Sequence, residues 1–327
     1  MCYTNPYAAR AENYEVPFAS TSGEQVMDIR SALRDAIAHL ERADTPSAPL
    51  AAELLLMHAL GRDRAWIYAH PEQELDAQTR ERYFSMIARR AAGVPTQYLT
   101  GHQEFWGLEF EVSSDVLIPR PETEHVIEVS LEYLGVANSD SPRRQAEFRI
   151  ADVGTGSGCI AVALAHELPH ARVIATDISA AALVVARRNA ARHDALSRIE
   201  FIECNMMEGV SHQSPAASRP SLLFDLIASN PPYIGRREAA TLPREVREHE
   251  PESALFGGET GTEIYAPLIA QAAALLKPGG ILVLEIGYNC VVEVTRLLGA
   301  PQWEGVTLTK DLAGISRVVS AKRTAAL

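Results

Sequence analysis

The chain has 327 residues, 47% of them hydrophobic, which is enough for one large domain with a full core and a second, small one. Its formal net charge of -12 argues against a protein that holds a nucleic-acid backbone by counterion release, and suits a basic protein partner better. No apolar run reaches the length of a membrane span and the N-terminus lacks an apolar signal region, so we expect a cytoplasmic protein.

The cysteines are far apart in the sequence and show no metal-ligand spacing. Scattered cysteines of this kind are typical of buried or free thiols in a reducing compartment. We therefore expect no metal site. The four are Cys2, Cys159, Cys204 and Cys290.

The chain is predicted to begin with a disordered arm that leads into helices. Residues 1–26 mix Tyr, Pro, Ser and Asn without hydrophobic periodicity, as poorly ordered segments do. Residues 28–42 carry apolar side chains at helical spacing on one side. Pro49 is typical of the first turn of a second helix, and Gly61 of its C-terminal end.

Aspartates mark the expected starts of the later helices. Asp63 and Asp76 have short acceptor side chains and are candidate N-caps, and the last helix is expected to end at Gly93. Residues 27–98 are therefore predicted to form a small helical domain. Because it holds no conspicuous catalytic cluster, we expect it to recognise the substrate or to support the fold.

A change of period follows the helical domain. Residues 104–112 alternate polar and apolar side chains around a glycine, which predicts a β-hairpin, and we assign residues 99–116 to this linker. The larger domain is expected over residues 117–327. At its start two prolines stiffen the chain and Glu122 favours the beginning of a helix. Two interpretations of Arg120 and Glu122 remain open. They contact a ligand, or they form a helix cap beside a solvated arginine.

A strand, a glycine-rich turn and an apolar helix follow one another over residues 148–168. Such a unit brings backbone close to a ligand and points helical N–H groups at it. The spacing is not that of a dinucleotide fingerprint, because glycine falls at the fifth position and Cys159 at the sixth. With Asp152 just before the turn, the pattern Asp-x-Gly-x-Gly-x-Gly favours the methyl donor S-adenosylmethionine. The predicted contacts in this turn are Gly154, Thr155, Gly156, Ser157 and Gly158.

Two further strands, over residues 172–176 and 199–204, are expected to bring side chains to the same edge of the sheet. Asp177 follows the first, where a carboxylate can accept both ribose hydroxyls or cap the next helix. After the second, Asn205 and Met206 would flank the adenine or fill the strand end. The predicted cofactor contacts here are Asp177, Ile178, Asn205 and Met206.

A strand over residues 224–228 is followed by Asn-Pro-Pro-Tyr. In open α/β sheets ligands bind just past the carboxyl ends of such buried parallel strands. The prolines fix the backbone so that the Asn230 side chain and the Pro231 carbonyl can point the same way. Two acceptors beside the Tyr233 ring suit a planar NH2 group on an amide or a base. The alternative interpretation of the motif is a proline-rich turn that only closes the strand. We predict that Asn230, Pro231 and Tyr233 are catalytic, that these three and Pro232 bind the substrate, and that Asn230 also contacts the cofactor.

The segments around this corner are polar. Residues 211–221 are predicted to form a loop rich in Ser and Pro. Residues 235–252 carry four Arg and five Glu, and we expect them to lie over the pocket mouth, either as a solvated helix face or as a surface that reads a protein substrate. Residues 257–261 are expected to be a flexible glycine turn.

The end of the chain is predicted to complete the sheet. The last helix is expected over residues 265–276, followed by a strand over residues 281–286. Residues 306–308 and 315–319 suit two closing antiparallel strands.

Taken in order, these segments resemble the protein N5-glutamine methyltransferases, in particular those that act on peptide chain release factors. The match runs from about residue 28 to residue 320, and its most specific part is the block at residues 117–124 together with the helical domain. The matching blocks are Gln103-Glu104-Phe105-Trp106-Gly107, Leu117-Ile118-Pro119-Arg120-Pro121-Glu122-Thr123-Glu124, Asp152 to Gly158, Asn230 to Ile234, Glu250-Pro251, Gly257-Gly258 and Asp311-Leu312-Ala313-Gly314.

The resemblance implies a Rossmann-like class I S-adenosylmethionine-dependent methyltransferase fold with a small N-terminal helical bundle and a β-hairpin linker. It implies that the substrate is the glutamine of the Gly-Gly-Gln loop of bacterial release factors, methylated on the side-chain amide nitrogen N5. It places the cofactor on the residue 154–158 turn, Asp177, Met206 and Asn230, and the glutamine on residues 230–233. The expected partners are release factors, without membrane or direct nucleic-acid binding, and we expect a monomer.

Three other functions remain open from the residues alone. A glutamine methyltransferase of a ribosomal protein belongs to the same class. An amino methyltransferase of DNA or RNA shares the Asn-Pro-Pro-Tyr corner but predicts a basic cleft. A non-catalytic module would bind the donor and hold a partner with its helical domain.

Overall fold

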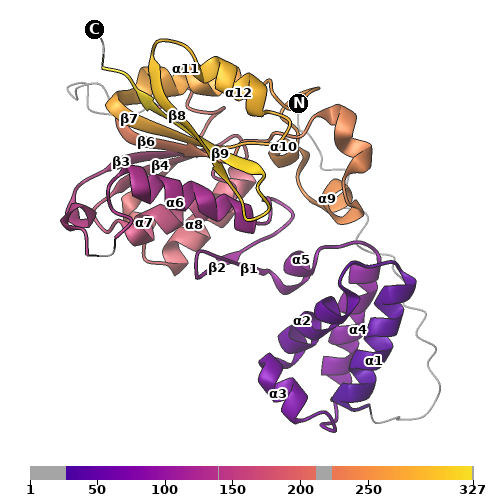
Figure 1. Ribbon diagram of the computed structural model, residues 1–327. Coiled ribbons are helices and arrows are strands. Elements are labelled where there is room, and N and C mark those ends of the chain that lie inside the picture. The colour runs from indigo at the N-terminus through magenta and orange to yellow at the C-terminus, as the bar shows by residue number, and fades with distance from the viewer. Residues whose placement is uncertain (1–26, 139, 211–222, 326–327) are drawn as a thin grey trace. The chain divides into compact units, whose positions relative to one another are not determined.

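The computed structural model describes residues 27–138, 140–210 and 223–325. The predicted arm, residues 1–26, and the predicted loop, residues 211–221, lie outside these described residues. The chain divides into two compact units, Met1–Thr100 and Gly101–Leu327 (Figure 1). Within the described part, no helix is long and apolar enough to cross a membrane.

The first unit is helical, as predicted. Its helix starts follow the aspartates, since Asp28, Asp63 and Asp76 each accept a backbone N–H from the residue three positions on, at 2.7–2.8 Å. Gly61 ends the second helix with φ 63°, a conformation that favours glycine. The helices are α1 (Ile29–Arg42), α2 (Ala48–Leu60), α3 (Arg64–Ala69), α4 (Ala77–Ala91) and α5 (Thr96–Thr100).

The core of the first unit is formed where α1, α2 and α4 pack together. Tyr83 on α4 is fully buried, and its hydroxyl donates to the Ala52 carbonyl oxygen of α2 at 3.1 Å. The Tyr83 ring adds apolar area to the core, and the hydrogen bond satisfies its buried hydroxyl. Recognition or support by this unit stays a prediction.

The second unit is built on a seven-stranded sheet in the order β5-β4-β3-β6-β7-β9-β8. Strands β3 to β7 are parallel to one another, and β9 runs antiparallel to both of its neighbours, β7 and β8. The predicted α/β fold and the two closing antiparallel strands are therefore confirmed. The strands are β3 (Arg149–Val153), β4 (Arg172–Asp177), β5 (Ile199–Glu203), β6 (Phe224–Ser229), β7 (Leu276–Glu285), β8 (Trp303–Lys310) and β9 (Ser316–Arg323).

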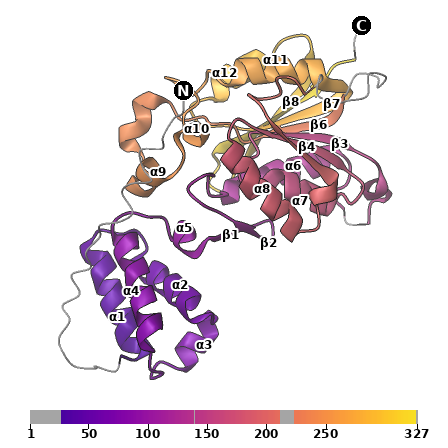
Figure 2. The ribbon, with the colours of Figure 1, turned by 180° about the vertical axis from the view of Figure 1, so that it is seen from behind.

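Helices cover both faces of this sheet, with α6, α7 and α8 on one face and α11 and α12 on the other (Figures 1 and 2). They are α6 (Glu124–Tyr133), α7 (Cys159–Glu167), α8 (Ala180–Arg192), α11 (Tyr265–Leu275) and α12 (Val291–Leu298). Two short helices, α9 (Arg244–His249) and α10 (Glu252–Leu255), follow β6. Short 3-10 helices are η1 (Pro121–Thr123), η2 (Pro142–Gln145), η3 (Leu196–Arg198) and η4 (Arg236–Thr241).

Successive side chains of the central strands point to opposite faces of the sheet, so neighbouring residues belong to different hydrophobic cores. Ile150 and Val283 belong to the core beneath α6, α7 and α8, whereas Ala151 and Leu282 belong to the core beneath α11 and α12. Strands buried on both faces read as continuous apolar runs, which is why the sequence predicted them as buried.

The prediction that the helix over residues 265–276 is the last one was wrong. Leu276 is the first residue of β7, and α12 follows β7. This helix has only eight residues, of which Val294 and Leu298 are buried. So short a segment carries too few apolar positions for a periodic signal, and its packing against α11 and β8 stabilises it instead.

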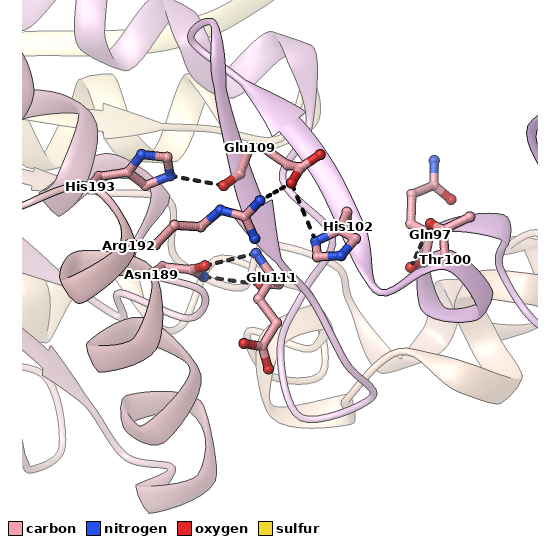
Figure 3. Close-up of polar contacts among 8 residues, drawn as sticks. All are labelled: Gln97, Thr100, His102, Glu109, Glu111, Asn189, Arg192 and His193. Atoms are coloured by element: carbon pink, nitrogen blue, oxygen red, sulfur yellow. Dashed lines mark hydrogen bonds and ion pairs between the residues drawn. The ribbon is translucent and has the colours of Figure 1, made fainter. Parts of the chain in front are cut away.

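The predicted β-hairpin is present as β1 (His102–Phe105) and β2 (Leu108–Glu111). It is fixed to α8 inside the second unit (Figure 3). The fully buried Asn189 accepts from the backbone N–H of Glu111 at 2.7 Å and donates to its carbonyl oxygen at 3.0 Å, as a neighbouring strand would. Arg192 and the C-cap residue His193 also contact Glu109, so two side chains of α8 and its C-cap hold the second strand of the hairpin.

Candidate active site

A cavity of about 280 Å³ lies at the carboxyl ends of the parallel strands. Its wall includes residues from the turn after β3, the ends of β4 and β5, and the corner after β6. Strand β3 is flanked by β4 on one side and β6 on the other, so the chain reverses its direction of winding there. Ligands of open α/β sheets bind at such a switch point.

The glycine turn after β3 forms one wall. Gly154 and Gly156 adopt φ values of 73° and 54°, and a Cβ added at either would meet no atom within 4 Å. Both glycines line the cavity, as Thr155 and Ser157 do. Gly158, with φ 83°, does not line it, because it faces α8, where an added Cβ would come within 3.1 Å of Ala186. The turn therefore presents backbone without side chains to a ligand on one side and to a helix on the other.

Asp152 holds the turn from beneath. Its carboxylate is fully buried and accepts from the Thr155 hydroxyl at 2.6 Å and from the Ala161 backbone N–H at 3.0 Å. Burial raises the pKa of this carboxyl to about 7. Its Oδ1 is buried without a hydrogen-bond partner among the described residues. Because Asp152 is not in the cavity wall, it shapes the turn from inside the protein.

Asp177 lies at the end of β4, in the cavity wall. Its two oxygens accept from the backbone N–H groups of Gly156 and Ser179, both at 2.9 Å. Burial raises the pKa of Asp177, and these backbone hydrogen bonds oppose the rise. Ser179, not Asp177, is the N-cap of α8, because its hydroxyl accepts from the Ala182 N–H at 3.2 Å. Asp177 was predicted either to bind a ribose or to cap α8. Because Ser179 caps the helix, the role left for Asp177 is the one toward a ligand in the cavity that it lines.

The remaining predicted cofactor residues also line the cavity. Ile178 is 63% exposed, which leaves a large apolar surface beside the carboxylate. Met206 takes φ 52°, a left-handed conformation that is rare for a residue with a side chain. Asn205 donates to Glu208 at 3.0 Å. An apolar and a polar side chain therefore follow β5, and Ile178 follows β4.

The corner after β6 forms another part of the wall, with Asn230, Pro231 and Pro232 lining the cavity. The Ser229 hydroxyl donates to the Val153 carbonyl oxygen at 2.6 Å, which joins the corner to the end of β3. Tyr233 does not line the cavity, and its hydroxyl donates to Glu285 at 3.1 Å. Both burial and the Glu285 carboxylate raise the pKa of Tyr233. The corner and the glycine turn thus share one cavity at the end of adjacent strands.

The glycine turn at residues 257–261 supports this corner by close approach. A Cβ on Gly257 would collide with the Pro232 carbonyl oxygen, and one on Gly261 with that of Tyr233. Ile234 is paired with Phe256 in a parallel bridge, which fixes the two segments side by side. We expected a flexible turn, whereas the structure packs it tightly against the backbone of the corner.

The structure separates the alternatives for Arg120 and Glu122. Arg120 lines the cavity, and its guanidinium binds both oxygens of Glu250 at 2.6 and 2.7 Å. Glu250 is 5% exposed, so it is a buried partner for a half-buried arginine rather than part of a solvated cap. Glu122 is outside the cavity wall and faces Arg317 at 3.9 Å.

None of the arginines and glutamates of the charged segment, residues 235–252, lines the cavity, and Pro251 is its one residue in the wall. Its arginines pair with nearby glutamates on the surface, such as Arg244 with Glu248 at 3.0 Å. The wall on this side comes from Pro251, Ser253, Ala254 and Phe256. Either interpretation of the charged segment, a solvated face or a surface for a protein substrate, stays a prediction.

Two buried residues of the site were missed by sequence reasoning. Thr123 is 2% exposed and Glu285 is 1% exposed, and the Thr123 hydroxyl donates to the Glu285 carboxylate at 2.6 Å. The Asn230 side-chain amide in turn donates to Thr123 at 3.1 Å. A signal for Glu285 existed, since it is a charged residue at the end of an apolar strand.

Comparison with known families agrees with this arrangement in both units. Residues 31–101 match the family described as PrmC N-terminal domain, and residues 140–246 match the methyltransferase small domain. The catalytic domain of hMettl16 in complex with MAT2A 3'UTR hairpin 6 is a structural neighbour with a TM-score of 0.50 and 18% sequence identity. That similarity covers 73% of this chain and 81% of the hMettl16 chain, and it supports the fold alone.

Curated relatives match over most of both chains. The chain is 46% identical to the release factor glutamine methyltransferase of Koribacter versatilis (strain Ellin345), over 91% of this chain and 99% of the relative. It is 42% identical to the protein of the same name from Moorella thermoacetica, again over 91% of this chain and 99% of the relative. With near-complete coverage at this identity, the chain belongs to the release factor glutamine methyltransferase family.

Proposed function

We propose that the protein transfers a methyl group from S-adenosylmethionine to the side-chain amide nitrogen N5 of the glutamine in the Gly-Gly-Gln motif of peptide chain release factors. The observation that carries this proposal is the shared cavity, whose wall contains both the glycine turn and the Asn-Pro-Pro corner. The names of the relatives supply the class of substrate.

The cavity wall suits the methyl donor. Gly154 and Gly156 leave room for the ligand against their backbone. Asp177 uses its oxygens for two backbone N–H groups, and a carboxylate has about four lone-pair sites, so it keeps capacity for two ribose hydroxyls. Ile178 and Met206 offer apolar and polarizable surface to an adenine ring. When bound, S-adenosylmethionine supplies an electrophilic methyl group on a sulfonium sulfur.

The corner after β6 suits the acceptor. A primary amide nitrogen has two N–H donors, and we propose that the Asn230 Oδ1 and the Pro231 carbonyl oxygen accept them. Both residues line the cavity. Two acceptors on a rigid backbone hold the nitrogen in one orientation, which provides the positioning that a weak nucleophile needs.

The same two acceptors stabilise the transition state. An amide nitrogen is a poor nucleophile because its lone pair is delocalised into the carbonyl group. As the bond between the nitrogen and the methyl carbon forms and the bond from that carbon to sulfur breaks, with S-adenosylhomocysteine as the leaving group, the nitrogen gains positive charge and its N–H groups become stronger donors. Asn230 and Pro231 therefore bind the transition state more tightly than the ground state. The surplus proton leaves after transfer, when the nitrogen is acidic, so these residues need not remove it beforehand.

The helical unit and the cellular setting complete the proposal. We assign recognition of the release factor to residues 27–98, because this unit is separate from the one that carries the cavity and its residues from 31 on match the PrmC N-terminal domain. The enzyme would act as a monomer in the cytoplasm, where its substrate takes part in translation.

The decisive experiment is mass spectrometry of a substrate peptide. The full chain is incubated with S-adenosylmethionine and a release factor, and the tryptic Gly-Gly-Gln peptide is examined for one added methyl group on the glutamine side chain. Matched reactions contain a release factor with asparagine in place of that glutamine, a ribosomal-protein preparation, or DNA and RNA. Methylation of nucleic acid or of a ribosomal protein, with none on the release factor, would refute the proposal.

A further inference from the structure

A buried carboxylate lies behind the Asn-Pro-Pro-Tyr corner. Glu285 is at the end of β7 and is 1% exposed. Its Oε2 accepts from the Thr123 hydroxyl at 2.6 Å and its Oε1 accepts from the Tyr233 hydroxyl at 3.1 Å. Each oxygen of this carboxylate therefore binds a hydroxyl donor that belongs to a different segment of the site.

With Glu285 ionised, the hydrogen-bond chain through Thr123 has one direction, because a carboxylate can only accept. A threonine hydroxyl has a single hydrogen, and in this structure it is donated to Glu285. The oxygen of Thr123 is then left to act as an acceptor, and it accepts from the Asn230 Nδ2 at 3.1 Å. The order is thus Asn230 amide, Thr123 hydroxyl, Glu285 carboxylate.

This order selects one of two orientations of the Asn230 amide. The oxygen and nitrogen arms of an amide have nearly the same shape, so packing alone does not distinguish them. With the nitrogen arm bound to Thr123, the oxygen arm is the one left for a ligand in the cavity that Asn230 lines. A flipped amide would present N–H donors to the N–H donors of the substrate.

We infer that Thr123 and Glu285 are positioning residues, which hold the Asn230 amide with its oxygen toward the glutamine that is methylated. This inference rests on the proposed function, since it concerns the same acceptor. Thr123 is itself held in place, because its backbone N–H donates to the Arg120 carbonyl oxygen at 3.0 Å in the turn η1. Neither residue needs to touch the substrate.

The test compares Thr123→Val with Thr123→Ser in the full-length protein. Valine has nearly the shape of threonine but neither donates nor accepts, whereas serine keeps the hydroxyl. Ser130→Ala is the matched control, because it removes another buried hydroxyl whose bond, to the Val126 carbonyl oxygen at 2.6 Å, stays within α6. For each variant we would measure kcat and KM with a release factor and the dissociation constant of S-adenosylmethionine.

We expect Thr123→Val to lower kcat by about fivefold, the effect of one neutral hydrogen bond, while the affinity for S-adenosylmethionine changes little. Thr123→Ser should retain most of the wild-type kcat, and Ser130→Ala should match the wild type. Thr123→Ala removes the hydroxyl without placing a methyl group against the carboxylate, so it reaches the same result by a second route.

The outcomes separate this inference from the proposed function. If wild-type protein methylates no glutamine, the proposed function fails and the inference fails with it. If wild-type protein is active and Asn230→Ala is not, but both Thr123→Val and Thr123→Ala keep a wild-type kcat, then only the positioning role is overturned. A loss of donor affinity equal to the loss of kcat would also overturn it, because that result indicates general disruption of the site.

Discussion

Replacing Asn189 by alanine should release the hairpin from α8. Asn189→Ala removes the bonds to the Glu111 N–H at 2.7 Å and to its carbonyl oxygen at 3.0 Å (Figure 3). At about 1 kcal/mol for each hydrogen bond, the contact loses about 2 kcal/mol, which is about 30-fold in the equilibrium for local opening. Hydrogen exchange measured by mass spectrometry on peptides that cover residues 102–112 should therefore be faster by about that factor.

The same substitution should reach the glycine turn, because the Asn189 amide also donates to the Ser157 carbonyl oxygen at 2.8 Å. Losing this third bond should weaken S-adenosylmethionine binding by about fivefold, as measured by calorimetry. Asn289→Ala is the control, since that exposed amide binds Glu238 at 3.0 Å. Unchanged exchange in residues 102–112 of Asn189→Ala would show that Asn189 does not hold the hairpin.

Three further predictions concern the site itself. Asn230→Ala should lower kcat by about 10²-fold or more with donor binding preserved, and near-normal turnover would contradict the role of its oxygen as an acceptor. Gly257→Ala should lower stability by about 1–3 kcal/mol in thermal unfolding, because its Cβ would collide with a carbonyl oxygen, whereas Gly299→Ala, where the nearest atom is 3.3 Å away, should be nearly neutral. The pKa of Glu285 is raised by burial to about 7 and that of Asp152 likewise, so the native state binds more protons than the unfolded state between the ordinary carboxyl pKa and about 7. Their contribution to stability is present at low pH and should be lost as pH rises through about 7, by up to about 1.4 kcal/mol per pH unit for each group, and denaturant titrations of Glu285→Gln should show a smaller decline with pH. A decline as steep in Glu285→Gln as in the wild type would argue that Glu285 does not titrate in this range.

Charged and titratable groups surround Glu285 and set its environment. Glu122 raises its pKa and Arg317 lowers it, while the hydroxyls of Thr123 and Tyr233 lower it by donating to the ionised form. Tyr265 donates to the Glu285 backbone carbonyl oxygen at 3.3 Å, on its other side. Because burial is the largest cause, removing Arg317 should shift the stability profile less than removing the carboxyl itself.

Local patterns in the sequence predicted much of the fold. Asp63 and Asp76 were predicted as helix caps, and each accepts the expected backbone N–H. The glycine turn after β3 and the corner at Asn230 were placed after buried strands, and both do follow them. These features depend on contacts between residues close in the chain, so a few neighbouring residues suffice to specify them.

The sequence could not indicate which distant residues meet at the site. Thr123 and Glu285 are 162 positions apart, and Arg120 and Glu250 are 130 positions apart. Likewise, the turn that contains Gly257 was predicted to be flexible, and the structure shows it packed. The sequence could not indicate this packing, because the atom that Gly257 approaches, the Pro232 carbonyl oxygen, belongs to another segment. The sequence by itself determined the strands, the caps and the two turns that line the cavity, because periodicity and turn chemistry are local. Only the tertiary structure decided that a buried carboxylate on β7 sets the orientation of Asn230, since the order of strands in the sheet brings their ends together.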